Sequence, residues 1–500
     1  MSEPADPGSA ATPTDSPTDS PAARRAAARR AATRRRQVRR RLLRRARVDA
    51  RRALHRYRGR SGLLIGLLLG ALLGVLGLTL VEQATRPDGR SIAAQSPLRI
   101  VMDRDVSAGR QRIRLLQQWN DLQRGLLRAG RPAYPLVDVA ELAADATAWH
   151  DDLVTRFQSR EPADVVTLDV TWTPEFAEGG YLRPIDTDRL RLDDFLAQPM
   201  RTCEYGGQIW ALPFNTDVGL LYYNTALIQP AAGRFETWDR LTTTLSTLDL
   251  PAGVAAYVGQ FDSEGLSVNV QEILQPAVDS RAKVTVSDAA HRQFTAFVER
   301  LTARAGPFPA HNEERSYSQF SAHRAAVMRN WPLAIRRLGM LAENPVPFAV
   351  SPVPGGGMLG GQNLAVTATS ERPIAAQALI EFLTDTHSQQ QLFQQGGFAA
   401  TRRSTYFNHD LRQAYGPDRS QPDSRRWTTD IILDAVENAR LRPREQHYAR
   451  FSAELQRSLR PVLTGAARPP DRPALEQALT RALTGRLDGE RQWWRLLADA

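Results

Sequence analysis

An uncharged, Leu- and Gly-rich run from Ser61 to Val81 constrains this chain more than any other feature. As a helix, these 21 residues extend about 30 Å, which is enough to cross the hydrocarbon core of a bilayer. The preceding block, Arg24–Arg60, holds 18 arginines and should stay on the cytoplasmic side. The sequence therefore predicts one transmembrane helix over residues 61–82 in the cell membrane, with a cytoplasmic N-terminus and an extracellular C-terminal domain.

A cleaved signal peptide is the alternative for the same run. Such peptides have an apolar stretch of about 7–15 residues and a small-x-small cleavage site. Here 60 residues precede the run, and Glu82–Pro87 offers no Ala-x-Ala site. Cys203 is the only cysteine, so no lipid-accepting cysteine follows the run and no intrachain disulfide can form. We therefore favour an uncleaved signal anchor.

The net excess of positive charge comes from the N-terminal part of the chain. Arg24–Arg60 carries a net +17 and residues 1–23 carry −4, so the total of +11 leaves −2 for residues 61–500. The extracellular domain thus has no bulk attraction for nucleic acid, and no nucleic-acid partner is predicted. For the arginine block we favour a topology-determining segment that binds anionic lipids over one that binds nucleic acid.

The rest of the N-terminal part divides by composition. Residues 1–22 are mainly Ser, Thr, Pro, Asp and Ala, which predicts a disordered cytoplasmic tail. Residues 23–60 form the arginine-rich cytoplasmic segment, and residues 83–96 form a linker. Glycine recurs at every fourth position of the span, which favours a helix-packing face, although glycine is common in membrane helices in general. These glycines are Gly62, Gly66, Gly70 and Gly74.

The chain from about residue 97 onward has an α/β pattern. Apolar runs at 98–102, 135–139 and 164–170 read as strands, and helix-period stretches follow at 113–127 and 142–159. Strands that alternate with helices of this length indicate a parallel sheet covered on both faces. Ligands of such sheets lie outside the carboxyl ends of the strands.

Eight sequence blocks, in order, carry a resemblance to a known family. The block Asp164–Asp186 resembles the second-strand region of the extracellular solute-binding proteins of ABC importers, family 1, the maltose- and trehalose-type sugar binders. The other blocks are similar to later regions of the same family and extend the resemblance to about residue 460. They are 209–224, 236–239, 259–269, 325–332, 360–366, 396–402 and 442–444.

The resemblance implies a type 2 periplasmic-binding-protein fold, in which two α/β lobes close on a solute held in a central cleft. We expect the first hinge near Pro213–Asp217 and the second within Phe348–Gly357. The implied lobes are residues 97–215 with 350–395 (lobe 1) and residues 216–349 with 396–485 (lobe 2).

The resemblance also implies a set of ligand-binding residues. Carboxylates, amides and guanidinium groups can each meet two sugar hydroxyls, while aromatic rings cover the apolar sugar faces. Trp331 and Trp172 are the expected stacking residues. At the position after Gly361, many relatives carry an aromatic residue, but this chain carries Gln362. One aromatic surface that would stack against the sugar is therefore weakened. The polar candidates are Asp169, Asn215, Asp217, Glu264, Gln362 and Arg442, and Gly361 completes the predicted ligand-binding set.

Each assignment has a structural alternative. An aspartate at a strand end, such as Asp169, often caps a helix or forms a turn. Glu264 and Arg442 are equally compatible with salt bridges on a lobe surface. Trp331, which Pro332 holds in extended geometry, is also compatible with an ordinary core position.

Enzymatic chemistry lacks its usual motifs in this sequence. No His-Glu-x-x-His, Gly-x-Ser-x-Gly or Gly-x-x-x-x-Gly-Lys occurs, so no catalytic, metal or cofactor site is predicted. A two-carboxylate glycosidase that uses Asp169, Asp217 and Glu264 stays open, because the required separation is not visible in a sequence. We expect a protein that is not an enzyme.

The sequence therefore predicts a membrane-anchored extracellular solute-binding protein. It would capture a sugar, a di- or oligosaccharide, by lobe closure and deliver it to the permease subunits of an ABC importer. The alternative is an extracellular sugar sensor that signals to a cytoplasmic partner through the span and the arginine-rich tail.

Overall fold

The computed structural model describes residues 96–485, except 162, 189, 230–234, 342 and 421–425. The chain divides into two units, Met1–Pro87 and Asp88–Ala500, and every described residue belongs to the second unit. The predicted tail, arginine-rich segment and membrane span lie outside the described residues. Within the described part of the chain, no helix is both long and apolar enough to span a bilayer.

A six-stranded sheet forms the centre of one half of the described unit. Its strands follow the order β2-β1-β3-β14-β4, and β7 also pairs with β14. β1 is parallel to β2 and β3, whereas β14 is antiparallel to β3, β4 and β7, so the sheet is mixed rather than parallel as predicted. The strands are β1 (Leu98–Met102), β2 (Val137–Glu141), β3 (Val165–Asp169), β4 (Leu182–Arg183), β7 (Ala211–Val218) and β14 (Leu359–Thr367).

Helices cover both faces of this sheet because its strands are apolar on both sides. Ile100 packs into the cluster with α4 and α13, and its neighbour Val101 into the cluster with α5 and α6, as the alternation of strand side chains requires. Asp145 caps α5 by accepting a hydrogen bond from the Ala148 N–H at 3.0 Å. The covering helices are α4 (Gln111–Arg128), α5 (Ala146–Gln158), α6 (Thr173–Glu178) and α13 (Pro373–Leu383).

A second, four-stranded sheet forms the centre of the other half, in the order β13-β8-β12-β9. One face packs against α8, α9, α10, α17 and α18, and the other against α11, α12 and α16. The strands are β8 (Leu220–Asn224), β9 (Ala255–Val258), β12 (Ala325–Asn330) and β13 (Phe348–Pro352). The helices are α8 (Trp238–Thr247), α9 (Ser263–Leu274), α10 (Asp288–Ala305), α11 (Glu313–Ser321), α12 (Leu333–Gly339), α16 (Thr428–Glu437), α17 (Tyr448–Leu463) and α18 (Arg472–Leu483).

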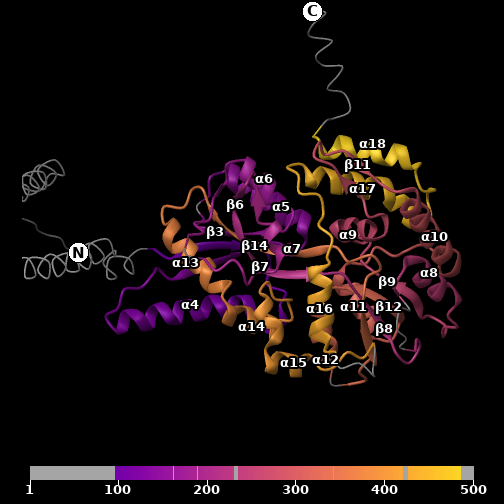
Figure 1. Cartoon of the computed structure of the whole chain (residues 1–500), viewed down its shortest axis with the longest axis horizontal. Coiled ribbons are helices and arrows are strands. Elements are labelled where there is room, and N and C mark those ends of the chain that lie inside the picture. The colour runs from indigo at the N-terminus through magenta and orange to yellow at the C-terminus, as the bar shows by residue number, and fades with distance from the viewer. Residues whose placement is uncertain are drawn as a thin grey trace, which may run out of the picture. The chain divides into compact units, whose positions relative to one another are not determined.

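We name the first sheet with α4, α5, α6 and α13 the first lobe, and the second sheet with α8–α12 and α16–α18 the second lobe (Figure 1). Shorter elements complete the described chain. They are η1 (Ala108–Arg110), α7 (Ala197–Arg201), β5 (Glu204–Tyr205), β6 (Gln208–Ile209), β10 (Ala277–Val278), β11 (Val284–Thr285), α14 (Thr386–Gln394), η2 (Arg403–Phe407) and α15 (His409–Tyr415).

The chain passes between the lobes three times: the first two crossings are adjacent, and the third lies between α13 and α16. β7 and β8 are separated only by Gly219, and β13 and β14 by residues 353–358. The Gly219 N–H donates to the Met358 carbonyl oxygen at 3.3 Å, so the two crossings touch. The first hinge is predicted near Pro213–Asp217, and in the structure these residues lie within β7, just before Gly219.

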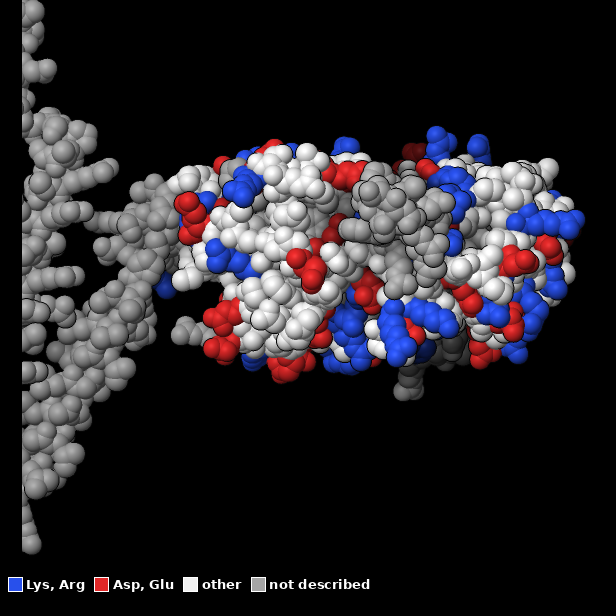
Figure 2. Space-filling model, turned by 90° about the horizontal axis from the view of Figure 1, so that it is seen from above, with Lys and Arg blue, Asp and Glu red and all other residues white. Residues whose placement is uncertain are grey.

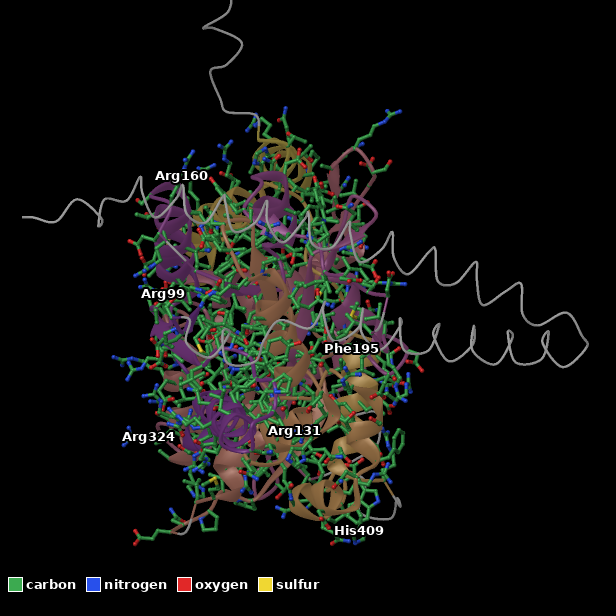
Figure 3. All side chains as sticks on the ribbon, turned by 90° about the vertical axis from the view of Figure 1, so that its left-hand side faces the viewer. Arg99, Arg131, Arg160, Phe195, Arg324 and His409 are labelled. Carbon is green, nitrogen blue, oxygen red and sulfur yellow. The ribbon has the colours of Figure 1, made fainter. Side chains whose placement is uncertain are left out.

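A glycine is required at the first crossing. A Cβ atom on Gly219 would lie 2.0 Å from Oε1 of Glu272 and 2.6 Å from Nη2 of Arg329. The Glu272–Arg329 ion pair therefore packs directly against the hinge backbone. Side chains fill the space between the ribbons in Figure 3, which labels Phe195. The guanidinium of Arg402 lies over the Phe195 ring, 3.9 Å from its centre.

Candidate functional site

Strand β14 brings together several residues that the sequence predicts for the site. Gln362 lies opposite Asp169 of β3 on one side and opposite Asn215 of β7 on the other, and Gly360 lies opposite Asp217. The edge where β3 ends therefore adjoins the crossing between the lobes.

Gly361 has a steric role at this point. Its φ of +117° is unfavourable for other residues, and a Cβ atom there would lie 2.4 Å from the Asn215 carbonyl oxygen. Glycine thus allows β7 and β14 to pair closely beneath the site.

Asp169, Glu264 and Arg442 meet in one ion network that joins the lobes. Nη2 of Arg442 donates to Oδ1 of Asp169, and Nη1 donates to Oε1 of Glu264, both at 2.9 Å. Arg442 is buried, so this contact is no surface salt bridge. Burial raises the pKa of the Glu264 carboxyl, and the charge of Arg442 partly offsets that rise.

The turn predicted as an alternative for Asp169 is present as well. Oδ1 of Asp169 accepts hydrogen bonds from the Thr171 N–H at 2.9 Å and from the Thr171 hydroxyl at 2.7 Å. Asp169 therefore both shapes the turn before α6 and reaches across to Arg442.

Arg112 is a central residue that sequence analysis missed. It is fully buried, and Nη1 donates to both carboxylate oxygens of Asp103, at 2.9 and 2.8 Å. Nη2 donates to Oδ1 of Asn215 at 2.9 Å and also to Oε1 of Gln362. The glutamine that replaces an expected aromatic residue thus belongs to a polar network built around Arg112.

Asp217 is buried with an incomplete set of hydrogen bonds. Its Oδ2 accepts one long bond from Nδ2 of Asn215 at 3.4 Å, and its Oδ1 has no partner among the described residues. Burial raises the pKa of Asp217 to about 8, against the opposing charges of Arg112 and Arg329. At neutral pH this carboxyl is therefore mostly protonated and can donate as well as accept a hydrogen bond.

Trp331 is half-buried and held from several directions. The guanidinium of Arg329 lies over its ring at 3.9 Å from the ring centre. The Tyr222 hydroxyl donates to the Trp331 carbonyl oxygen at 2.6 Å. A Cβ atom on Gly360 would lie 3.2 Å from the indole, so glycine leaves room for the ring. Trp331 is thus a fixed ring with one face backed by Arg329.

Trp172 lies deeper than a typical stacking residue. It is 5% exposed and packs against Trp149 at 4.4 Å, His150 at 5.0 Å and Phe176 at 6.3 Å between ring centres. It belongs to the hydrophobic cluster between the first sheet and α5 and α6. Trp172 is thus a core residue that also lines a cavity between the lobes.

A cavity of about 340 Å³ lies between the lobes, beside the Asp169–Arg442–Glu264 network. The first lobe contributes residues from the start of α5 and the end of β3, and the second lobe contributes the start of α9 and α17. Its walls combine carboxylates, hydroxyls, an imidazole and aromatic rings. The polar and aromatic lining residues are Thr147, His150, Asp151, Asp169, Thr171, Trp172, Glu264, Tyr448, Arg450, Ser452 and Gln456.

Eight of these eleven cavity residues were not predicted from the sequence, and Tyr448, Ser452 and His150, three of the eight, each contact a carboxylate. The Tyr448 and Ser452 hydroxyls both donate to the Glu264 carboxylate. Nε2 of His150 lies 2.9 Å from Oε2 of Glu175; burial of the imidazole opposes protonation, but Glu175 raises the pKa of His150 above its ordinary value. The helical spacing of Tyr448 and Ser452 is the only sequence signal that could have paired them.

The face of the molecule that Figure 2 presents carries both signs of charge. Figure 2 shows acidic and basic side chains interspersed over the face that it presents. This mixture agrees with the near-zero net charge calculated for residues 61–500.

Comparisons with known proteins agree with this architecture. The sequence model of one family, described as bacterial extracellular solute-binding protein, matches residues 137–411. A probable ABC transporter-binding protein of Deinococcus radiodurans is 28% identical over 231 residues. This alignment covers 42% of the present chain and 55% of that relative, so the chain spans about half the length of the curated relative.

Solved structures share the fold over most of this chain. The maltose-bound MalE3 of T. maritima is 26% identical with a TM-score of 0.65, covering 78% of this chain and 100% of that one. UgpB from Mycobacterium tuberculosis, in complex with glycerophosphocholine, is 19% identical with a TM-score of 0.61, covering 80% and 100%. The predicted α/β fold of the periplasmic-binding-protein type is thereby confirmed. The chain belongs to the bacterial extracellular solute-binding protein family.

Proposed function

We propose that this protein captures a sugar, a di- or oligosaccharide, between its two lobes and delivers it to the permease subunits of an ABC importer. The observation that carries the proposal is the cavity of about 340 Å³ whose walls come from both lobes. A solute there would contact both lobes at once and so favour the closed arrangement.

The chemistry of the site supports a neutral, hydroxyl-rich solute. Arg442 is already paired with the carboxylates of Asp169 and Glu264, so its charge is not free to bind an anionic solute, whereas the carboxylate oxygens can accept hydrogen bonds from hydroxyl groups. Trp331 and Asp217 do not line this cavity; both lie beside Gly360 of β14. There Trp331 offers a fixed ring for the apolar face of a sugar, and Oδ1 of Asp217 has no partner among the described residues. The maltose named with MalE3 agrees with this class of solute.

The proposal includes an anchor in the membrane. The apolar run at residues 61–82 and the arginine-rich segment before it support a single-pass arrangement with the binding domain outside the cell and anionic lipids at the tail. A binding protein anchored in this way would reach its importer by lateral diffusion.

Two experiments test the proposal. Calorimetric titration of the purified full chain with maltose, trehalose, longer maltodextrins, polyols and glycerophosphocholine should give saturable heats with one or more of the sugars. Saturable heats with glycerophosphocholine alone would refute the sugar assignment, and an absence of heat across the panel would refute solute capture. A protease added to intact cells should remove a C-terminal tag, whereas a protected tag would refute the external location.

A further inference from the structure

A second cavity, of about 430 Å³, lies in the second lobe beside the crossing from β13 to β14. Its walls are the end of β13, the crossing segment 353–357, residues just before α16 and one face of α16 itself. That face presents Ile431, Asp434, Ala435 and Asn438, which are spaced as neighbours on a helix. No described residue lines both this cavity and the one between the lobes, so the second cavity is separate from the place proposed for the captured solute.

Part of the wall of the second cavity is apolar. Tyr223 and Phe235 are buried, and their rings meet edge to face with 5.2 Å between the ring centres. Ile431 and Ala435 add aliphatic groups from α16. Because apolar walls favour a ligand that removes its own apolar surface from water, a molecule that fits this cavity carries hydrocarbon.

Asp418 brings an incompletely bonded carboxylate to the same cavity. It lines the cavity and is only 3% exposed. Its Oδ1 accepts hydrogen bonds from the Ser420 N–H at 2.8 Å and from the Ser420 hydroxyl at 2.5 Å. Its Oδ2 has no hydrogen-bond partner among the described residues. A buried acceptor without a donor costs free energy, so a bound molecule that donates a hydrogen bond to Oδ2 would recover that cost.

The charges around the second cavity favour a positively charged donor. Its described lining residues include three carboxylates, of Glu236, Asp418 and Asp434, and one guanidinium, of Arg426. Nη2 of Arg426 donates to Oδ2 of Asp434, so this cation is already engaged. Glu236 and Asp434 are exposed whereas Asp418 is buried, so carboxylates lie both at the rim of the cavity and inside it. An anion would meet repulsion there, and a cation would meet attraction.

We propose that this cavity is a second binding site, for a small organic cation with a primary ammonium group on a hydrocarbon chain. The ammonium group has three N–H donors and no acceptor, which suits the unpartnered Oδ2 of Asp418. The hydrocarbon chain packs against Tyr223 and Phe235, a contact that a bare metal ion cannot make. A second ammonium group on the same chain can reach the carboxylates at the rim. The site is independent of the solute held between the lobes.

Calorimetric titration of the full chain in detergent, without sugar, tests the second site. The probes are propylamine, 1,4-diaminobutane and spermidine, with calcium chloride and sorbitol for comparison, and at least one amine should give saturable heat. Asp418→Asn should weaken that binding tenfold or more. Asparagine keeps a carbonyl oxygen for the two Ser420 bonds but places an NH₂ donor where the ammonium group should bind. Equal affinity in the variant, or saturable heat with calcium or sorbitol but with no amine, would overturn the proposal, as would no heat at all.

Matched variants separate the site from a general effect of charge. Asp410→Asn removes one exposed carboxylate from α15, which is bonded to α16 through Arg412 and Asp430 but does not line the cavity, and should keep the affinity. An equal loss in Asp410→Asn would overturn the site. If Asp418→Asn fails to fold, Ser351→Phe decides, because it adds a ring to the cavity from a half-buried position of β13 and should abolish binding. Unchanged affinity in Ser351→Phe would overturn the proposal. Since no sugar is present, the outcome is independent of whether the protein captures one.

Discussion

The guanidinium of Arg329 lies 3.9 Å from the centre of the Trp331 ring. Arg329 is itself held by Glu272, which accepts from its Nη2 at 2.6 Å and from its Nε at 3.0 Å. Oε1 of Glu272 also accepts from the Met358 N–H at 2.9 Å, at the crossing between the lobes. Trp331 is thus connected to the hinge through one buried ion pair.

Replacing Trp331 by alanine should weaken solute binding about tenfold or more, equivalent to about 1.4 kcal/mol, because the apolar face of the solute loses its stacking surface. The measurement is calorimetric titration with the sugar that binds best in the panel. Trp210→Ala is the matched control: Trp210 is also half-buried, with its Nε1 bonded to the Tyr205 carbonyl oxygen at 2.9 Å, and its loss should leave the affinity unchanged. Equal affinities for both variants and the unmodified protein would exclude Trp331 from the site.

Replacing Glu272 by glutamine should lower the free energy of unfolding by about 3 kcal/mol, because a buried guanidinium is left without its counter-charge. Chemical denaturation at neutral pH measures the effect. Asp121→Asn removes the exposed Arg124–Asp121 pair and should change stability by less than about 1 kcal/mol. A loss in Glu272→Gln no larger than in this control would mean that the pair beneath the hinge contributes little.

Asp217 should make stability depend on pH. Its pKa of about 8 exceeds the value of 3.8 expected without burial, so the folded state binds the proton more tightly than the unfolded state. Protonated Asp217 therefore contributes to the free energy of unfolding. This contribution is complete below about pH 4 and is lost as the pH rises towards 8, by at most about 1.4 kcal/mol per pH unit. Unfolding free energies measured between pH 5 and 8 should therefore fall more steeply for the unmodified protein than for Asp217→Asn. If the unfolding free energy fell with pH at the same rate in both proteins, the pKa of Asp217 would lie near its ordinary value.

Gly219→Ala should destabilise the fold, since the added methyl group would lie 2.0 Å from the Glu272 carboxylate in a space that cannot relax freely. We expect a loss of about 1–3 kcal/mol, measured by chemical denaturation. Gly125→Ala is the control, because a Cβ atom added at this position within α4 would have no atom within 4 Å apart from its own helix backbone and chain neighbours. That change should be neutral or slightly stabilising, as alanine favours a helix. Similar stability of the two variants would argue against tight packing at the crossing.

Much of the fold could be predicted because its signals are local. The strand predicted at 98–102 is β1, and the helix predicted at 113–127 is α4, which extends to Gln111–Arg128. Apolar periodicity and turn residues act over a few neighbours, so a single sequence carries them. The antiparallel pairing of β14 with β3 could not be predicted in this way, because β14 enters the first sheet only after the chain returns from the second lobe.

The contacts of the site could be predicted only in part. Asp169 and Arg442 are separated by 273 residues, and nothing near either one indicates that they pair. Arg112 was missed because it is one of 65 basic residues and lies in an ordinary helical stretch. Motif position named Asp169, Glu264 and Arg442, which the structure brings together, but it missed Arg112, Tyr448 and Ser452. The pairing among these residues follows from tertiary structure alone.

A crystal structure of the protein with its best-binding sugar tests the central claim most directly. The account predicts the sugar between the two lobes, within hydrogen-bond distance of residues from both, with Trp331 against one of its apolar faces. A sugar bound to one lobe alone, or on the outer surface away from the crossing segments, would contradict it.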